Sequence, residues 1–197
     1  MQKVKSGVWF INWYKYCQAY LQLASIGLLE LKEQQYRNKF DLFEQSNIYT
    51  DKILLVSIVW CLKHAIELLL KALTSRITKK FSTTHENPEL HEEIKLAFSS
   101  LKINNSELLE ELISLSNKYY KLEFWNSFST SNSDINDNLN DIFRYPESKI
   151  SFTLGIEKFY KLTDANQLEL ENDIKRLSKL LFKLHGEITA VKIRKNK

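Results

Sequence analysis

A row of polar side chains interrupts an otherwise apolar stretch at residues 53–77. At 100° per residue, five of its members share one narrow arc of a helix and a sixth lies at the edge of that arc: Trp60, His64, Glu67, Lys71 and Thr74, with Lys63 at the edge. A carboxylate and an ammonium four residues apart form an ion pair in the favourable order. An imidazole one turn away adds a group that titrates near neutral pH. Such a row can bind a charged ligand or transfer a proton.

Each of these groups also has a structural interpretation. Glu67 and Lys71 form either an ion pair on the exposed edge of a mostly buried helix or part of a cleft or dimer interface. His64 is either a hydrogen-bonded structural histidine, which is the commoner case, or a proton carrier. The sequence leaves both pairs of alternatives open.

The segment that carries the polar row is expected to form a helix packed among other helices. Apart from Trp60, whose ring is largely apolar, residues 53–62 contain one polar side chain, Ser57, and apolar residues occupy most of the circumference after it. A helix of this kind must be buried on most sides. We predict a central helix over residues 51–77, with Thr50 as its N-terminal cap.

Further helices are predicted on both sides of the central one. Residues 6–45 repeat apolar side chains at intervals of three and four, which predicts one long helix or two joined ones. Asn87-Pro88 starts a helix that runs to about Leu101, and Asn104 with Glu107 caps a fourth. Asp164 with Gln167 forms a capping box for a last helix at 165–190.

Two stretches lack this period. Residues 126–142 are rich in Ser, Asn and Asp and are predicted to be a mobile loop. Residues 150–162 alternate in part, which indicates a short hairpin or an irregular segment. The fold class is therefore all-α, a bundle of about five helices in one domain that spans residues 1–197.

Charge and composition bear on whether the protein binds nucleic acid, spans a membrane or is secreted. The net charge of +4 arises from 28 basic and 24 acidic residues that are mixed along the chain, which is too weak to indicate nucleic-acid binding by itself. The longest uncharged run, Tyr16 to Leu29, has 14 residues, whereas a membrane span needs roughly 20. Cys17 and Cys61 lie in apolar helical patterns, and no secretory signal is recognisable. We expect a cytoplasmic protein that does not contact a membrane.

No metal or cofactor is predicted. Histidines and glutamates gather near one helix start, at His85, Glu86, Glu89, His91, Glu92 and Glu93. The two histidines are six residues apart, which fits neither H-x-x-x-H nor H-E-x-x-H, and no cysteine joins them. Glycine-rich phosphate loops and a G-x-S-x-G nucleophile motif do not occur in the sequence, and neither cysteine has the electropositive surroundings of an activated thiol.

Two stretches resemble the HEPN superfamily of small helical domains, found in prokaryotic defence and toxin–antitoxin systems. HAIELLLKAL at residues 64–73 matches the E-x-x-x-K pair of the family's central helix. FRYP at residues 143–146 resembles the arginine segment before the last helix. The order of elements is similar too, with a histidine-bearing connector, Thr84-His85, after the central helix.

The resemblance implies a homodimer and, for catalytic members of the family, a metal-independent ribonuclease with an R-x(4–6)-H motif. In that chemistry, histidine transfers the proton and arginine donates to the phosphate. Here no histidine follows Arg144 within six residues. Arg176 and His185 are nine residues apart and face opposite sides of a helix. Glu67, Lys71 and Arg144 are the positions that the resemblance carries over as ligand-binding residues.

Three hypotheses follow. The preferred one is a non-catalytic or degenerate HEPN-like protein of a defence or toxin–antitoxin system, which binds RNA, a nucleotide or a partner protein. The second is a HEPN ribonuclease toxin with a displaced histidine, His64 or His185, for which His64 and Arg144 are the catalytic candidates. The third is a helical scaffold that pairs with a cognate antitoxin or a nucleotidyltransferase-like protein.

Overall fold

The structure is a computed structural model that describes residues 6–33, 47–80, 82–101, 106–120 and 164–195. These ranges contain five helices and no strand: α1 (Ser6–Glu33), α3 (Asn47–Thr78), α4 (Asn87–Leu101), α5 (Ser106–Tyr120) and α9 (Asp164–Lys195). The predicted all-α class is therefore confirmed. The loop at 126–142, the segment at 150–162 and the C-terminal part of the 6–45 prediction lie outside the described residues.

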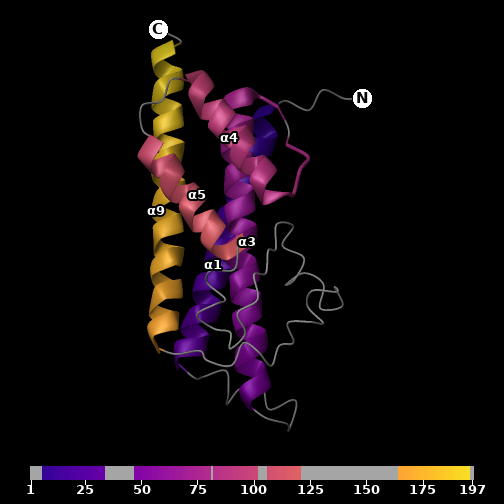
Figure 1. Ribbon diagram of the computed structural model, residues 1–197, viewed down its shortest axis with the longest axis vertical. Helices are drawn as coiled ribbons and strands as arrows, with labels where there is room; N and C mark the ends of the chain where they lie inside the picture. Colours follow the sequence, from indigo (N-terminus) through magenta and orange to yellow (C-terminus); the bar gives the residue numbers. More distant parts are fainter. Residues whose placement is uncertain (1–5, 34–46, 81, 102–105, 121–163, 196–197) are drawn as a thin grey trace.

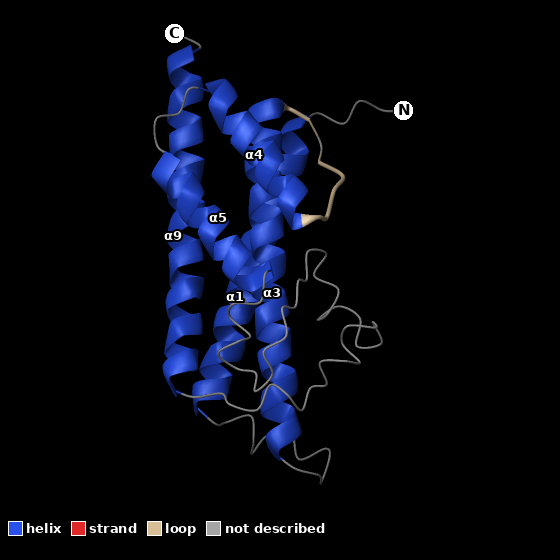
Figure 2. Cartoon of the chain, viewed as in Figure 1, coloured by secondary structure: helices blue, strands red, loops and turns tan. Residues whose placement is uncertain are grey.

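α1, α3 and α9 run along the longest axis of the molecule, and the shorter α4 and α5 cross its upper half (Figure 1). α1 runs antiparallel to α3 and α9 (Figure 1). α4 and α5 lie against the C-terminal half of α3 (Figures 1 and 2). The hydroxyl of Tyr119 on α5 donates to Asp173 Oδ2 on α9 over 2.8 Å, which joins the short layer to the last helix.

α3 is the centre of the bundle, as its apolar circumference predicts. All five residues predicted on the face opposite the polar row are buried: Ile58, Leu62, Ala65, Leu69 and Leu73. The flanking positions Ile66, Leu68, Leu70 and Ala72 are buried as well. Lys63, at the edge of the row, is 0% exposed, and its ammonium lies 4.6 Å from the centre of the Tyr120 ring.

Most helix boundaries agree with the sequence signals. α4 begins at the predicted Asn87 and α9 at the predicted Asp164, although α9 continues to Lys195. The start predicted for the central helix is wrong, because α3 begins at Asn47 and Thr50 lies inside it instead of capping it. Neither glycine nor proline occurs between Asn47 and Thr50, so the backbone has no reason to leave the helical conformation there.

One glycine sets the distance between α1 and α3. A Cβ atom placed on Gly27 would lie 2.8 Å from Cγ1 of Ile58, closer than side chains approach in folded proteins. Gly27 therefore lets the backbone of α1 pack directly on the central helix. Among the described residues, no helix is both long enough and apolar enough to cross a membrane.

Candidate functional site

The polar row of α3 is mostly inside the protein. Glu67 and Lys71 are each 4% exposed, and Thr74 is 5% exposed. The interpretation of Glu67 and Lys71 as an ion pair on the exposed edge of the helix is therefore wrong. Periodicity shows which direction a side chain points, but it does not show whether another segment covers it.

That cover includes the connector between α3 and α4. α3 ends where Lys79 adopts a left-handed backbone conformation with φ 62°, and its N–H donates to Ser75 O over 3.0 Å. The Thr78 hydroxyl donates to Thr74 O over 2.9 Å and accepts the N–H of Lys80 over 3.1 Å. These bonds pair backbone groups at the C-terminal end of α3 and turn the chain away from the helix axis.

The connector then folds back against α3. The N–H of Glu86 donates to the Thr84 hydroxyl over 3.1 Å, and Leu90 N–H donates to Glu86 O over 3.1 Å as α4 begins. Asn87, which is buried, accepts a hydrogen bond from the Ser116 hydroxyl over 2.8 Å. This bond holds the start of α4 against α5 and leaves His85 facing α3.

Three charged or titratable atoms meet at this point. Glu67 Oε1 lies 2.8 Å from Lys71 Nζ and 2.8 Å from His85 Nδ1, and the two nitrogens are 3.2 Å apart. His85 is 18 residues from Glu67 in sequence. The other carboxylate oxygen, Oε2, lies 3.4 Å from His64 Nδ1. One carboxylate thus contacts a lysine and two histidines.

The carboxylate is ionised at neutral pH. Burial acts to raise the pKa of Glu67, but hydrogen bonds from His64 and Lys71 and the charge of Lys71 outweigh burial and lower it to about 2. The Lys71 ammonium is therefore matched by a carboxylate in contact with it. A phosphate at Lys71 would be repelled by that same carboxylate, so the structure does not support Lys71 as a free phosphate ligand.

The neighbours of His85 indicate which of its ring nitrogens carries the proton. An ammonium only donates hydrogen bonds and an ionised carboxylate only accepts them. The shorter contact, from Nδ1 to Glu67 Oε1, favours Nδ1–H as donor to the carboxylate. In the neutral ring the proton acceptor is then Nε2. The His85 side chain is 57% exposed, in contrast to Glu67 and Lys71.

Aromatic rings flank the second histidine. The His64 ring stacks on Trp60 with centroids 5.2 Å apart and an interplanar angle of 11°. The Tyr20 and His64 rings lie nearly perpendicular, with centroids 4.6 Å apart. Trp60 Nε1 is buried and has no hydrogen-bond partner among the residues that the structure describes. His64 is 25% exposed, so it lies at the border between this aromatic group and solvent.

The remaining sequence candidates do not join this site. Arg144 lies outside the described residues. Arg176 contacts Glu111 on α5 over 2.5 Å, whereas His185 stacks on Phe10 of α1 with centroids 5.4 Å apart. Burial and the nearby charge of Arg76 lower the pKa of His185. Arg176 and His185 therefore contact different helices, as their spacing predicts, and neither reaches Glu67.

The sequence does not predict that His85 belongs to this site. The sequence marks it as part of a histidine-bearing connector and as a rejected metal candidate. His91, the other histidine of that group, is buried in α4, whereas His85 is exposed. No group of three or more His, Cys, Asp or Glu side chains in the described part of the chain is placed to hold a metal. Burial raises the pKa of both Cys17 and Cys61, which opposes thiolate formation.

Comparison with protein-family models, with curated proteins and with solved structures finds no match to this chain.

Proposed function

We propose that this chain is a HEPN-like helical protein that binds RNA or a nucleotide beside His85. The single observation that supports the proposal is the convergence of His85, from the connector, on the buried pair of Glu67 and Lys71. An ion pair that only stabilises the fold does not need a third, solvent-exposed side chain in contact with it. Here the pair holds an exposed imidazole in one orientation.

The groups beside His85 fit a ligand that has both a base and a phosphate. His85 offers a ring nitrogen for a hydrogen bond, and its protonated form also attracts an anion. His64 and Trp60 form a stacked aromatic pair on the same helix, and aromatic side chains stack on nucleobases of any sequence. Glu67 and Lys71 position the histidines and do not contact the ligand directly.

The experiment is a binding titration with fluorescein-labelled single-stranded RNA and with a labelled nucleotide. We expect His85→Ala to weaken binding by about tenfold or more, because an oriented hydrogen bond to a charged group is lost. Thr83→Ala is the matched control, since Thr83 is an exposed residue of the same connector. Equal affinity of wild type and His85→Ala, with both folded by circular dichroism, would sink the proposal.

A second candidate function is favoured by one contact. A carboxylate that holds Nδ1–H of an exposed histidine leaves Nε2 as a general base, the arrangement that a metal-independent ribonuclease uses to take the 2′-hydroxyl proton. Cleavage of RNA in EDTA that is lost in His85→Ala and retained in Thr83→Ala would support catalysis. Intact RNA with retained binding would leave the protein as a binder.

A further inference from the structure

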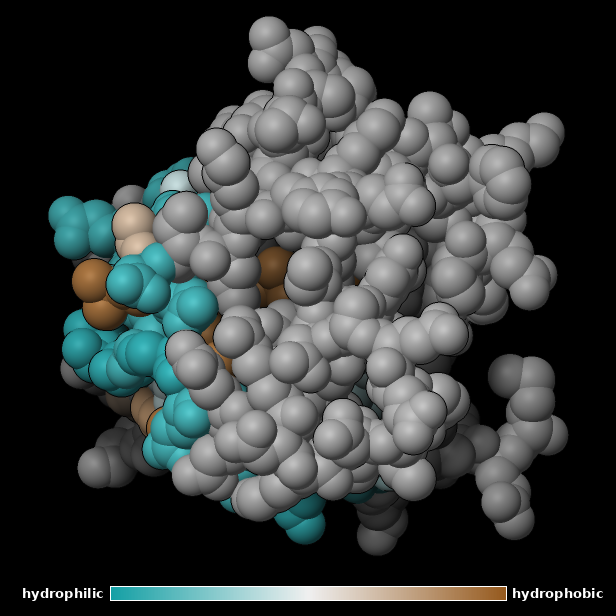
Figure 3. Space-filling model, turned by 90° about the horizontal axis from the view of Figure 1, so that it is seen from below, coloured by the Kyte–Doolittle hydropathy of each residue, from teal (hydrophilic) through white to brown (hydrophobic). Residues whose placement is uncertain are grey.

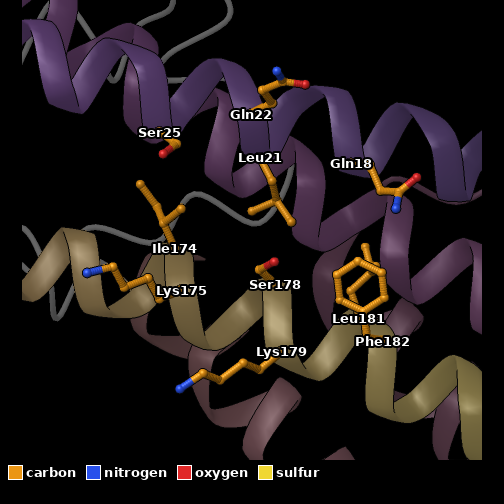
Figure 4. Close-up of a pocket in the computed structure, with 10 residues that line it drawn as sticks. All are labelled: Gln18, Leu21, Gln22, Ser25, Ile174, Lys175, Ser178, Lys179, Leu181 and Phe182. Atoms are coloured by element: carbon orange, nitrogen blue, oxygen red, sulfur yellow. The ribbon is translucent and has the colours of Figure 1, made fainter.

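A groove runs between α1 and α9, on the helix pair that does not include the Glu67 site. Its main hollow has a volume of about 510 Å³ (Figure 4). Leu21, Ile174 and Leu181 are buried and form its apolar floor, and Phe182 stands at one end with 59% of its surface exposed. Ser25 and Ser178 are small side chains on facing helices, so the middle of the groove is open to a third helix.

The groove continues along both helices. A second hollow of about 150 Å³ shares Ser25, Ile174 and Lys175 with the first and extends to Lys32 and Glu171. From Gln18 to Lys32, α1 advances ~21 Å at ~1.5 Å per residue, the length of a helix of roughly four turns. A helical segment of that length fits the groove lengthwise.

One strongly exposed apolar side chain of α1 lines the groove. Leu29 is 53% exposed and lines the second hollow, whereas Leu23 and Ile26, 55% and 51% exposed, do not line either hollow. Seen from the end where α1 stops and α9 begins, hydrophobic side chains lie exposed among hydrophilic ones on the described surface (Figure 3). Single exposed apolar residues are ordinary, but Leu29 and Phe182 are both exposed along the same apolar groove, which favours an interaction surface.

The charges of the groove have one predominant sign. In the described part of the chain, its lining contains three lysines, Lys32, Lys175 and Lys179, and one carboxylate, Glu171. Glu171 is already shared, because Lys175 contacts it over 2.6 Å and Lys32 contacts its other oxygen. The rim therefore attracts acidic groups.

We propose that this groove binds an amphipathic helix of a partner protein, with an apolar stripe on the floor and Glu or Asp on the flank that faces Lys175 and Lys179. The recognition is a helix-in-groove mode, in which apolar anchors one turn apart enter the groove and the charged flank sets the orientation. The proposal is independent of the His85 site, because no residue of that site lines the groove.

Two other occupants fit less well. A two-fold dimer through this groove would place the same lysine-rich surface of both copies at one interface, with like charges opposed. Single-stranded RNA would match the charge, but it requires aromatic platforms for its bases. Among the described residues, Phe182 is the one aromatic side chain that lines the two hollows.

The test uses two synthetic 16-residue helical peptides on the full chain, measured by fluorescence anisotropy. Both carry leucines at i, i+3, i+4 and i+7, and one has glutamates where the other has lysines on the flanks. We expect the acidic peptide to bind at least tenfold more tightly. Lys179→Glu should weaken it about fivefold, and Ser178→Trp, which fills the middle of the groove, should abolish binding.

Lys95→Glu is the matched control, because it makes the same charge change on exposed α4, away from the groove. It should leave the affinity for the acidic peptide unchanged. Equal binding of the two peptides, or equal effects of Lys179→Glu and Lys95→Glu, would overturn the proposal. So would a dimer, by light scattering, that Ser178→Trp converts to a monomer, or RNA binding that Lys179→Glu weakens and the acidic peptide does not displace.

Discussion

Glu67 and Glu171 have similar partners in very different surroundings. Each accepts a bond from a lysine four residues later, over 2.8 Å and 2.6 Å, and each has a further basic partner from another segment. The pKa of each carboxyl is lowered to about 2. For Glu67 this happens against the opposing effect of burial, whereas for Glu171 the hydrogen bonds from Lys175 and Lys32 act with little burial to oppose them.

Equal pKa values therefore do not imply that the two ion pairs contribute equally to the stability of the fold. Water and salt screen an exposed pair, and breaking it leaves both charges solvated. Breaking a buried pair leaves a charge that has neither water nor a counter-ion. The four predictions that follow separate these two cases, beginning with the largest effect.

Glu67→Gln is expected to lower the free energy of unfolding by about 3–5 kcal/mol, because it leaves the Lys71 ammonium buried without a carboxylate. Urea denaturation followed by circular dichroism measures this. The control is the double variant Glu67→Leu with Lys71→Met, which removes both charges and should recover most of the loss. A double variant as unstable as the single one would show that charge burial is not the cause.

Acid should remove the stabilisation that Glu67 provides. Its pKa is lower in the folded protein than the ordinary 4.5, so the unfolded chain binds more protons and stability falls as pH decreases. The contribution is complete above pH 4.5 and is lost towards pH 2, for a total of roughly 3 kcal/mol. Denaturation curves at pH 5 and pH 2.5 should show a smaller loss for the double variant than for wild type.

His85→Ala should cost about 1 kcal/mol, since one hydrogen bond to a charged group is lost at a largely exposed ring. Amide hydrogen exchange should become faster in residues 82–86, where that bond holds the connector to α3. Thr83→Ala should change neither quantity. Unchanged exchange in His85→Ala would mean that the other contacts of the connector suffice to hold it.

Glu171→Gln should shift the denaturation midpoint by little more than the measurement error, because its partners are solvated when released. Any shift should shrink between about 0.1 M and about 1 M NaCl as screening increases. The effect of Glu67→Gln should persist at both salt concentrations. A salt-independent effect of Glu171→Gln as large as that of Glu67→Gln would erase the distinction between the two pairs.

The sequence predicts a large part of the fold because helices depend on local features. The period of α3, the Asn87-Pro88 start of α4 and the capping box at Asp164 each act within a few residues. The predicted start of α3 is wrong because Thr50 is both an acceptable cap and an acceptable helix residue, so the sequence offers no clear signal there. The family resemblance rests on short motifs, and it remains a proposal.

The candidate site was predictable only in part. His64, Glu67 and Lys71 share a face because a helix fixes their spacing, and that relation is readable from sequence. His85 reaches them because Lys79 adopts a left-handed conformation and the connector folds back. A connector has no period, so its path depends on contacts made after the helices have packed.

By itself, the sequence determined that this chain forms long amphipathic helices around one apolar helix with a polar row, because backbone hydrogen bonding and side-chain period act locally. Only the tertiary structure decided that the row is buried, that His85 completes it, and that α1 and α9 leave a lysine-rimmed groove between them. Each of these features depends on which surfaces cover one another, and burial is a property of the packed chain and not of any segment within it.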